Sequence, residues 1–563
     1  MRCCLAALLL LAVVLLVGPE RVRAAGQAGD VDPTFHGGTP VLADLAKTVP
    51  RATYFSDLVV DGAGRIVVAG SSSDANGNTA VALARYSGDG ALDPGFAEGG
   101  SRVSQMGTAY SFPQNLFRVP GRYVGLGLYR TVDSVPDQSA YVIGENGFGD
   151  PGFGNSVAGL ATTSFPSPIS TSGAAAAPDG TIYVSGTYSD PEYWMQVNKF
   201  TPAGQVASNF PGFAGGFTKQ FDPGEETQGG PVATMPDGSL VTAGMATLAG
   251  GGYGLLLVHV SPGGTLSSSF GEQEGFSVVD ASDPGSDGKY AYPYEVVIGP
   301  DREIYVVGSA NDAAEERAAM IARFTPSGER DYTFGSGGIK RIQLAGVGES
   351  SAFYHVALQP DGKIVAFADA GKGGGRILRL LEDGSLDPSF GNGGVVTPNF
   401  GGTESSVGGG EIVGNRLLVA GWVESAGRTY GALAAYLLGP QPDAGTPPAG
   451  PAKRGTLKLR KKRLKVDGKG RVGIPLTCSA AGPCAGRLAL IAATGKARVS
   501  KAKKAKVFAK RKYSLAAGAK KTITLKLSKP ARARAAARAG LRARFALVPQ
   551  GGAMKLTAVT LHR

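Results

Sequence analysis

The sequence has few of the residues that usually build catalytic or metal centres. Its 563 residues include only four histidines and four cysteines. It contains neither the Gly-x4-Gly-Lys-Ser/Thr loop that binds phosphates nor the Gly-x-Ser-x-Gly turn of serine hydrolases. The histidines, at positions 36, 259, 355 and 562, lie too far apart in sequence to indicate a zinc site by themselves. No cofactor is therefore expected, and calcium is the one ion considered further.

Long hydrophobic runs are also missing, with one exception at the start of the chain. The apolar run Leu5–Val17 follows Arg2 and precedes the small-residue stretch Val22-Arg23-Ala24. This is the pattern of a cleaved export signal, and the run is shorter than the roughly 18 residues that a membrane span needs. We predict a signal peptide at residues 1–24, no transmembrane segment after its cleavage, and a secreted or cell-surface location. A retained membrane anchor is the alternative.

Acidic residues are almost absent from the last fifth of the chain. From Lys453 onward there are 31 Lys and Arg residues and a single acid, Asp467, whereas the preceding part holds 26 basic and 44 acidic residues. Such an asymmetry separates two modules with different surfaces. The Pro-rich stretch 439–455 between them is predicted to be a linker.

What the chain has in abundance is an internal repeat. The clearest copy of its first motif is Gly384-Ser385-Leu386-Asp387-Pro388-Ser389-Phe390-Gly391-Asn392-Gly393-Gly394. The phenylalanine recurs with a period near 60, and Phe390 is expected to be buried between neighbouring structural units. This phenylalanine column comprises Phe35, Phe96, Phe153, Phe210, Phe270, Phe334 and Phe390.

A second motif alternates with the first. Its clearest copy is Gln359-Pro360-Asp361-Gly362-Lys363-Ile364-Val365, a turn followed by a short apolar run. Each unit is therefore expected to hold four strands, for example at residues 56–61, 65–70, 79–86 and 101–105. The apolar residue after the turn forms a second column of seven: Ile66, Tyr123, Ile182, Leu240, Ile304, Ile364 and Leu417.

The two ends of the repeat region predict how the array closes. It begins with a phenylalanine motif and one strand, 39–45, and it ends near Leu438 with three strands and no such motif. The N-terminal strand is thus expected to complete the last unit and remove the exposed sheet edges. We predict an all-β, seven-bladed β-propeller at 30–438, with an open β-solenoid as the alternative.

The LDPSFG-x-GG and PDGKIVV strings resemble the delta-60 repeat, which occurs in tandem arrays in bacterial exported and surface proteins. The resemblance covers roughly Asp30 to Leu438 and is most specific at the first and last full units. It implies a propeller-like array and no established activity.

The C-terminal module, 456–563, is predicted to be a small β-sandwich. Strand-like segments occur at 456–466, 471–478, 487–492, 506–513, 522–527, 541–548 and 555–561, with a short helix ending at Gly540. This pattern resembles the basic immunoglobulin-like domains at the ends of many exported actinobacterial proteins. Its charge would suit an acidic cell-envelope polymer, or it would simply keep the module soluble or dock it on the acidic propeller. Nucleic acid is not expected as a partner.

Four polar residues are candidates for a ligand site at the mouth of the propeller channel. Counting nine residues back from the second column aligns Asp57, Gln114, Glu295 and His355. If the ring closes, these side chains share the mouth, and carboxylates facing a histidine could bind a ligand or carry out acid–base chemistry. The alternative is a set of solvated strand starts. No catalytic residue is assigned.

Two acidic loops and one cysteine pair complete the candidates. Oxygen ligands for calcium occur at Asp74, Asn76 and Asn78 and at Asp280, Asp283 and Asp287, although turn formation explains both loops equally well. Cys478 and Cys484 are expected to form a small-loop disulfide in an exported chain.

Three functions fit these features. The first is an exported, non-catalytic binding or scaffold protein with a possible envelope attachment. The second is a propeller hydrolase or lyase acting on extracellular glycans or small molecules at the channel mouth. The third is a structural component of the surface layer. Neither the ligand nor the oligomeric state follows from the sequence.

Overall fold

The protein is described here from a computed structural model. It covers residues 26–439 and 457–562, without the internal stretches 47–51, 74–78, 105–109, 120, 131–136, 151, 155–159, 164–168, 178, 190–192, 208–209, 211–215, 220–225, 273–274, 347, 460–462, 479–483, 493–506, 516–518, 536–540 and 550–554. The predicted signal peptide therefore lies outside the described residues. The calcium candidates Asp74, Asn76 and Asn78 lie outside them as well.

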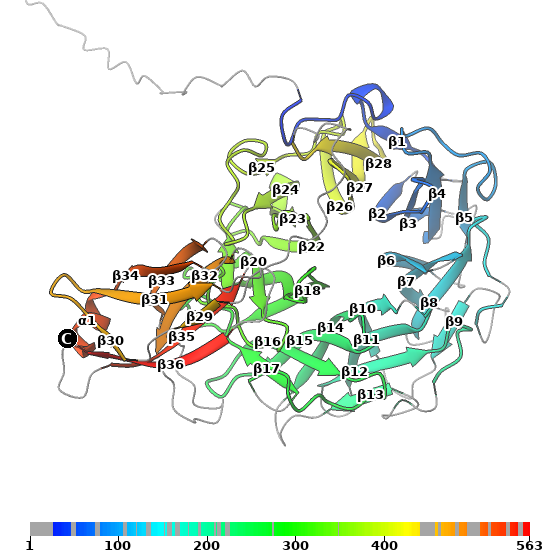
Figure 1. Cartoon of the computed structure of the whole chain (residues 1–563). Coiled ribbons are helices and arrows are strands. Elements are labelled where there is room, and N and C mark those ends of the chain that lie inside the picture. The colour runs from blue at the N-terminus through cyan, green and yellow to red at the C-terminus, as the bar shows by residue number, and fades with distance from the viewer. Residues whose placement is uncertain are drawn as a thin grey trace, which may run out of the picture.

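Seven four-stranded antiparallel sheets follow one another around a ring, so the body of the chain is a seven-bladed β-propeller (Figure 1). Six blades take their strands in chain order. Blades one to six consist of β2 (Thr53–Val60), β3 (Ile66–Ser73), β4 (Thr79–Tyr86) and β5 (Ser101–Ser104); β6 (Tyr110–Val119), β7 (Arg122–Arg130), β8 (Asp137–Gly144) and β9 (Leu160–Thr163); β10 (Ile169–Ala176), β11 (Ile182–Ser189), β12 (Tyr193–Phe200) and β13 (Gly216–Lys219); β14 (Thr227–Thr234), β15 (Leu240–Thr247), β16 (Tyr253–Val260) and β17 (Phe276–Val279); β18 (Ala291–Ile298), β19 (Ile304–Asn311), β20 (Arg317–Phe324) and β21 (Ile339–Ile342); β22 (Ala352–Leu358), β23 (Ile364–Asp369), β24 (Gly375–Leu380) and β25 (Val395–Val396).

The seventh blade combines both ends of the propeller. It contains β26 (Glu404–Val413), β27 (Arg416–Ser425) and β28 (Arg428–Leu437), and its fourth strand is β1 (Val41–Ala43) from the N-terminal segment. β1 pairs antiparallel with β28, with Val41 opposite Leu433 and Ala43 opposite Gly431. The short 3-10 helices η1 (His36–Gly38) and η3 (Gly371–Gly373) lie in loops.

Both predicted columns are buried. The phenylalanines are at most 4% exposed and the residues of the second column at most 1% exposed. Phe390 shares one apolar cluster with Val365 of blade six and Val419 of blade seven, so its ring lies between blades, as predicted. Gly384 shows why glycine recurs in the motif: its φ is +82°, and a Cβ atom there would lie 3.0 Å from the ring of Phe334.

A buried arginine completes the repeat motif. Arg379 lies at the end of β24, and its guanidinium donates to Asp387 (2.9 Å), to the Ser389 hydroxyl (3.0 Å) and to the Leu438 carbonyl oxygen at the end of blade seven. The guanidinium carbon is 4.7 Å from the ring centroid of Phe390. Each blade junction that carries this unit is thus held by a charge-assisted, buried hydrogen-bond network.

The same arrangement recurs around the ring. Equivalent ion pairs join Arg85 to Asp93, Arg323 to Asp331 and Arg416 to Asp32. Each of these arginines also donates to a backbone carbonyl of the following blade. At three junctions the arginine precedes the aspartate by eight residues, a regular spacing that the sequence itself displays.

The C-terminal region has two sheets around one apolar core. One contains β29 (Leu457–Leu459), β31 (Arg471–Cys478) and β34 (Lys520–Lys526); the other contains β30 (Arg463–Lys465), β32 (Cys484–Ala492), β33 (Val507–Leu515), β35 (Leu541–Pro549) and β36 (Lys555–His562). Leu464, Val472, Leu488 and Leu525 belong to the shared core. The helix α1 is Lys529–Ala535.

One expected strand of this region is divided in two. The segment 456–466 was predicted as a single strand, but β29 pairs antiparallel with β31 whereas β30 pairs parallel with β36, in the other sheet. A change of sheet within eleven residues requires a break in the strand, and alternating Leu and Lys residues do not reveal such a break.

Among the described residues, no helix combines the length and the apolar character needed to cross a membrane.

Candidate functional site

The first strand of every blade carries a β-bulge at the same level. The strand register shifts between Phe55 and Asp57, between Pro293 and Glu295, and between Phe353 and His355, and the other four blades show a shift at the corresponding place. A bulge leaves one residue unpaired and redirects the side chains next to it. Asp57, Glu295 and His355 directly follow these bulges.

Three of the four predicted residues occupy equivalent positions. Asp57 lies opposite Ala69, Glu295 opposite Val307 and His355 opposite Phe367 in the neighbouring strand of its blade. In blade two the equivalent residue is Asn115, opposite Leu126, whereas Gln114 is the unpaired bulge residue. Nine positions separate Asp57 from Ile66, but eight separate Asn115 from Tyr123, so a count of nine from Tyr123 selects Gln114.

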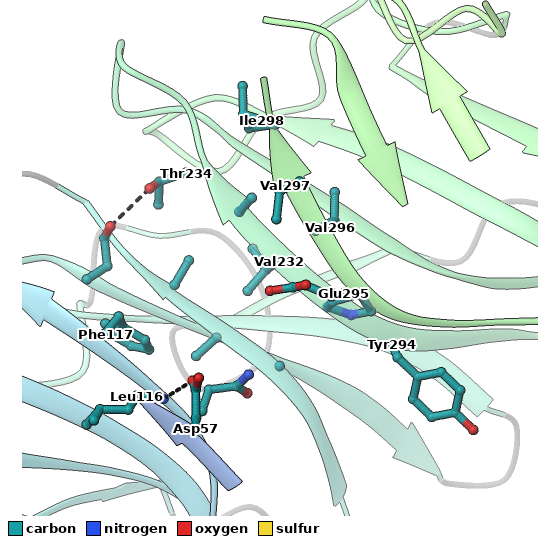
Figure 2. A pocket seen from close by; sticks show the side chains of 17 residues that line it. Asp57, Leu116, Phe117, Val232, Thr234, Tyr294, Glu295, Val296, Val297 and Ile298 are labelled. Atoms are coloured by element: carbon teal, nitrogen blue, oxygen red, sulfur yellow. Dashed lines mark hydrogen bonds between the residues drawn. The ribbon is translucent and has the colours of Figure 1, made fainter. Parts of the chain in front are cut away.

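First strands of five blades enclose a cavity of about 360 Å3 in the middle of the ring. Its walls come from β2, β6, β10, β14 and β18, and they include Asp57, Asn115 and Glu295. Figure 2 shows Asp57 and Glu295 on opposite sides of this cavity. Most of the remaining wall is small or apolar, with segments 173–176 and 231–233 facing the space.

The carboxylates of this site bind backbone amides of neighbouring blades. Asp57 Oδ2 accepts from the amide of Leu116 in blade two (2.8 Å), and its Oδ1 accepts from the amide of Leu58 (2.8 Å). Glu295 Oε2 accepts from the amide of Val356 in blade six (2.6 Å). These carboxylates therefore link adjacent blades where the bulges leave backbone donors.

A third carboxylate acts in the same way and was not among the predicted residues. Glu411 in blade seven accepts from the amide of Val60 in blade one (2.6 Å), and burial raises the pKa of its side chain. It lies four residues beyond Val407, after a Gly-Gly-Gly stretch that widens the bulge. Glu411 lies opposite Leu418, at the level of Val59 in blade one and not of Asp57, so the nine-residue count does not select it.

His355 is held in its charged form. Its Nδ1 lies 3.8 Å from Glu295 Oε1, and the two side chains are 17% and 25% exposed. Burial lowers the pKa of His355, but the neighbouring carboxylate of Glu295 and the charge of Asp57 outweigh it and raise the pKa to about 9. Burial raises the pKa of Asp57 to about 6, against the charge of His355 and the two backbone hydrogen bonds.

These pKa values constrain the chemistry of the channel. At neutral pH His355 is an imidazolium and cannot accept a proton, while Asp57 is largely ionised. A general base with a pKa near the working pH is the usual requirement for proton transfer. Asp57, with a pKa of about 6, comes near this requirement, whereas His355 is a charged partner of Glu295 at neutral pH.

The His355 pair predicts a pH-dependent stability. Because the folded pKa of His355, about 9, exceeds the ordinary 6.5, its stabilisation is complete below pH 6.5 and is lost as the pH rises through 9. Between these pH values we expect wild type to lose about 3 kcal/mol more stability than His355→Gln. Urea unfolding across this range measures the difference. His562→Gln, at an exposed position, is the control, and parallel pH profiles for wild type and His355→Gln would refute the assignment.

The second acidic loop uses its carboxylates as turn caps. Asp280 Oδ1 accepts from the amide of Ser282 (3.0 Å) and Asp283 Oδ1 from the amide of Gly285 (2.9 Å), while Glu315 accepts from the amide of Asp287. Within the described residues, no three His, Cys, Asp or Glu side chains are grouped so that they could hold a metal ion. Calcium binding stays a prediction for both loops.

The two cysteines lie at adjoining strand ends. Cys478, at the end of β31, is buried and disulfide-bonded. Cys484 is the first residue of β32. Their pairing with each other remains a prediction.

Comparison with known proteins bears on the propeller alone. Residues 64–96, 299–334 and 359–390 match a family profile described as "Domain of unknown function (DUF5122) beta-propeller". Each matched segment ends on a member of the phenylalanine column. A search of curated proteins finds no match.

Several solved structures are similar to this chain at low sequence identity. The β-propeller domain of the Trilobed protease from Pyrococcus furiosus, described as having an open velcro topology, is 10% identical, with 70% of this chain and 100% of that domain covered and a TM-score of 0.37. Prolyl oligopeptidase B from Galerina marginata is also 10% identical (TM-score 0.37); the match covers 76% of this chain but only 55% of that enzyme. Trypanosoma rangeli sialidase is 9% identical, with 83% and 90% covered and a TM-score of 0.32. These similarities carry no argument about ligand or reaction.

Proposed function

We propose that this chain is an exported, non-catalytic binding protein of the bacterial cell surface, with the propeller as a ligand platform and the basic C-terminal module as its attachment to the envelope. The observation that carries the proposal is the use of the channel carboxylates. Asp57, Glu295 and Glu411 each accept a backbone amide of the adjacent blade, so they hold the ring together. The resemblance to delta-60 repeats of exported proteins supports the same view.

The alternative is a hydrolase or lyase that acts on glycans or small molecules at the channel mouth. Asp57 and Glu295 face each other across the cavity, which is the one feature that favours it (Figure 2). Against it, the imidazolium of His355 is held between carboxylates and is not free to accept a proton. Reorganising these groups for catalysis would also break contacts between blades.

A turnover screen separates the two functions. Purified chain is assayed on a panel of glycans and esters beside Asp57→Asn and Glu295→Gln, which keep the size of each side chain. We expect no turnover above the buffer rate for wild type. Turnover by wild type that either variant abolishes would establish the enzyme and overturn the non-catalytic proposal.

The charge of the C-terminal module supports attachment to an acidic polymer. Along β34 the apolar Ile523 and Leu525 are buried, whereas Lys520, Lys521 and Lys526 are exposed. The only acid of the module, Asp467, is already paired with Arg471 at 2.9 Å. The outward basic side chains therefore present an uncompensated positive surface, whose attraction to a polyanion would weaken with salt.

Removing the module is expected to release the propeller. Cells that produce the chain without residues 453–563 should shed it into the medium, whereas the full chain should stay with the envelope and be washed off by high salt. A full-length variant with Lys520, Lys521 and Lys526 changed to glutamine keeps the module but removes three positive charges, so it tests the charge separately from the module itself. Immunoblotting of medium and envelope fractions gives the distribution, and equal release of the full and truncated chains would end the attachment proposal.

A further inference from the structure

A second cavity, of about 350 Å3, lies between blades five and six. Its walls come from β18, β19 and β20 of blade five and from the start of β22 and the end of β23 of blade six. Its volume lies at the lower end of the range for small-molecule sites, about 300–1,000 Å3. It differs from the central cavity in composition, because aromatic rings and charged groups of both signs line it.

Two tyrosine rings, Tyr294 and Tyr354, line this cavity, and Tyr292 packs beside Tyr294. The ring centroids of Tyr294 and Tyr354 are 4.5 Å apart at an angle of 54°, and those of Tyr292 and Tyr294 are 5.0 Å apart at 44°. All three side chains are partly exposed. Because the rings contact each other, they make a continuous bent surface and do not surround a central space.

The tyrosines break the symmetry of the repeat. Tyr294 and Tyr354 are the unpaired bulge residues of β18 and β22. The corresponding residue is Ser56 in blade one and Ser172 in blade three. Large aromatic side chains at this level in two adjacent blades create a feature that stability of the repeat does not require.

Other lining residues supply hydrogen-bonding groups. The Ser309 side chain lines the cavity, is 1% exposed, and has an Oγ atom without a hydrogen-bond partner. Arg317 lies at the rim with its guanidinium carbon 4.5 Å from the ring centroid of Tyr290. Glu349 and Asp369 add acceptors. A buried hydroxyl without a partner is costly, which points to a ligand group that completes its bonding.

This combination identifies a class of ligand. A saturated sugar ring has an apolar face of C–H groups that suits an aromatic surface, and hydroxyls that both donate and accept. An aromatic cage for a quaternary ammonium ion needs ring faces arranged around the cation, which the contacting rings do not provide. An anion would meet Glu349 and Asp369, and a simple cation would meet Arg317 and Lys372.

We propose that the cavity between blades five and six binds a pyranose sugar, free or as part of a glycan, stacked on Tyr294 and Tyr354. Its hydroxyls bond to Ser309 and to the charged side chains at the rim. The proposal rests on the proposed function of the propeller as a ligand platform and names the chemistry of one of its ligands. The volume accommodates roughly one or two sugar rings.

Ligand-observed NMR tests the proposal on the purified full chain. The probes are neutral mono- and disaccharides, one uronic acid, glycine betaine and choline. At least one neutral sugar is expected to bind, and Tyr354→Ala is expected to weaken its binding about 10-fold because an aromatic contact is lost. Tyr193→Ala, at an exposed tyrosine of β12, is the matched control and should bind like wild type.

Ser309→Ala separates binding from folding. Because its hydroxyl has no partner in the protein, its removal should leave thermal stability unchanged or slightly higher, while sugar binding weakens several-fold. Unchanged sugar affinity in both Ser309→Ala and Tyr354→Ala would overturn the site. If only betaine or choline binds, or if no probe binds, the proposal of a sugar ligand is wrong. The proposed binding function of the propeller would not be affected by that result. Cleavage of a bound sugar would instead refute the non-catalytic function.

Discussion

Replacing Arg379 with alanine is expected to lower the free energy of unfolding of the propeller by about 3–5 kcal/mol. The side chain is 2% exposed and its partner Asp387 is 5% exposed. Truncation would leave the Asp387 carboxylate buried without its counter-charge. It would also remove the hydrogen bonds to Ser389 and to the Leu438 carbonyl oxygen.

The loss should act mainly on the junction of blades six and seven. Arg379 belongs to blade six, whereas Leu438 follows the last strand of blade seven, so this side chain crosses the junction. Its guanidinium also covers the ring of Phe390, which fills the space between these blades. The variant therefore loses the ion pair, the hydrogen bonds and the packing against Phe390 at the same time.

Chemical denaturation followed by tyrosine and tryptophan fluorescence measures this effect. Arg428→Ala is the matched control, because Arg428 is 50% exposed and lies 3.7 Å from Asp44 in a surface ion pair. Its removal should cost at most about 1 kcal/mol. A similar small cost for Arg379→Ala would show that the buried arginine is not what holds the blades together.

Phe35→Ala is expected to destabilise the closure of the ring by about 3–5 kcal/mol. Phe35 is 1% exposed and packs in a cluster with Val41 of β1, Leu433 of β28 and Phe55 of β2. It therefore contacts the closing strand, the blade that this strand completes and the first blade. Losing the phenyl group of Phe35 would leave a cavity where the two ends of the propeller meet.

The expected signature is local as well as global. Beyond a lower unfolding midpoint, amide hydrogen exchange should accelerate in β28, which pairs with β1, more than in β19 of the distant fifth blade. Leu42→Ala is the control on the same strand, since Leu42 is 43% exposed between the buried Val41 and Ala43. Equal acceleration in β19 and β28 would contradict a closure that depends on this segment.

The periodic features of the sequence predicted the propeller because each repeat meets the same environment in every blade. The phenylalanine column and the second column are buried throughout, and the predicted strand 79–86 coincides with β4. The prediction was less successful where a turn changes length. In blade two the segment before Tyr123 is one residue shorter, so Asn115 takes the place assigned to Gln114. Glu411 of blade seven lies opposite Leu418, at a different level of the strand, so counting back nine residues missed it.

The site illustrates a different limit. Counting positions placed Asp57, Glu295 and His355 at one level of the ring. It did not identify the group that each side chain contacts. The two carboxylates accept from backbone amides about 60 residues away, next to bulges that no local sequence pattern indicates. Tyr294 and Tyr354 adjoin each other for the same reason, although each looks in the sequence like an ordinary strand residue.

The sequence by itself determined the repeat, the number of blades, the alternation of buried and exposed strand positions, and the separation of an acidic body from a basic end. These properties depend on local periodicity and composition, which are written along the chain. Only the tertiary structure decided that channel carboxylates join blades, that a charged His355 lies beside Glu295, and that two tyrosines line one cavity. Closing the ring brings residues of different repeats within hydrogen-bonding distance, and those contacts depend on bulges and turn lengths between them.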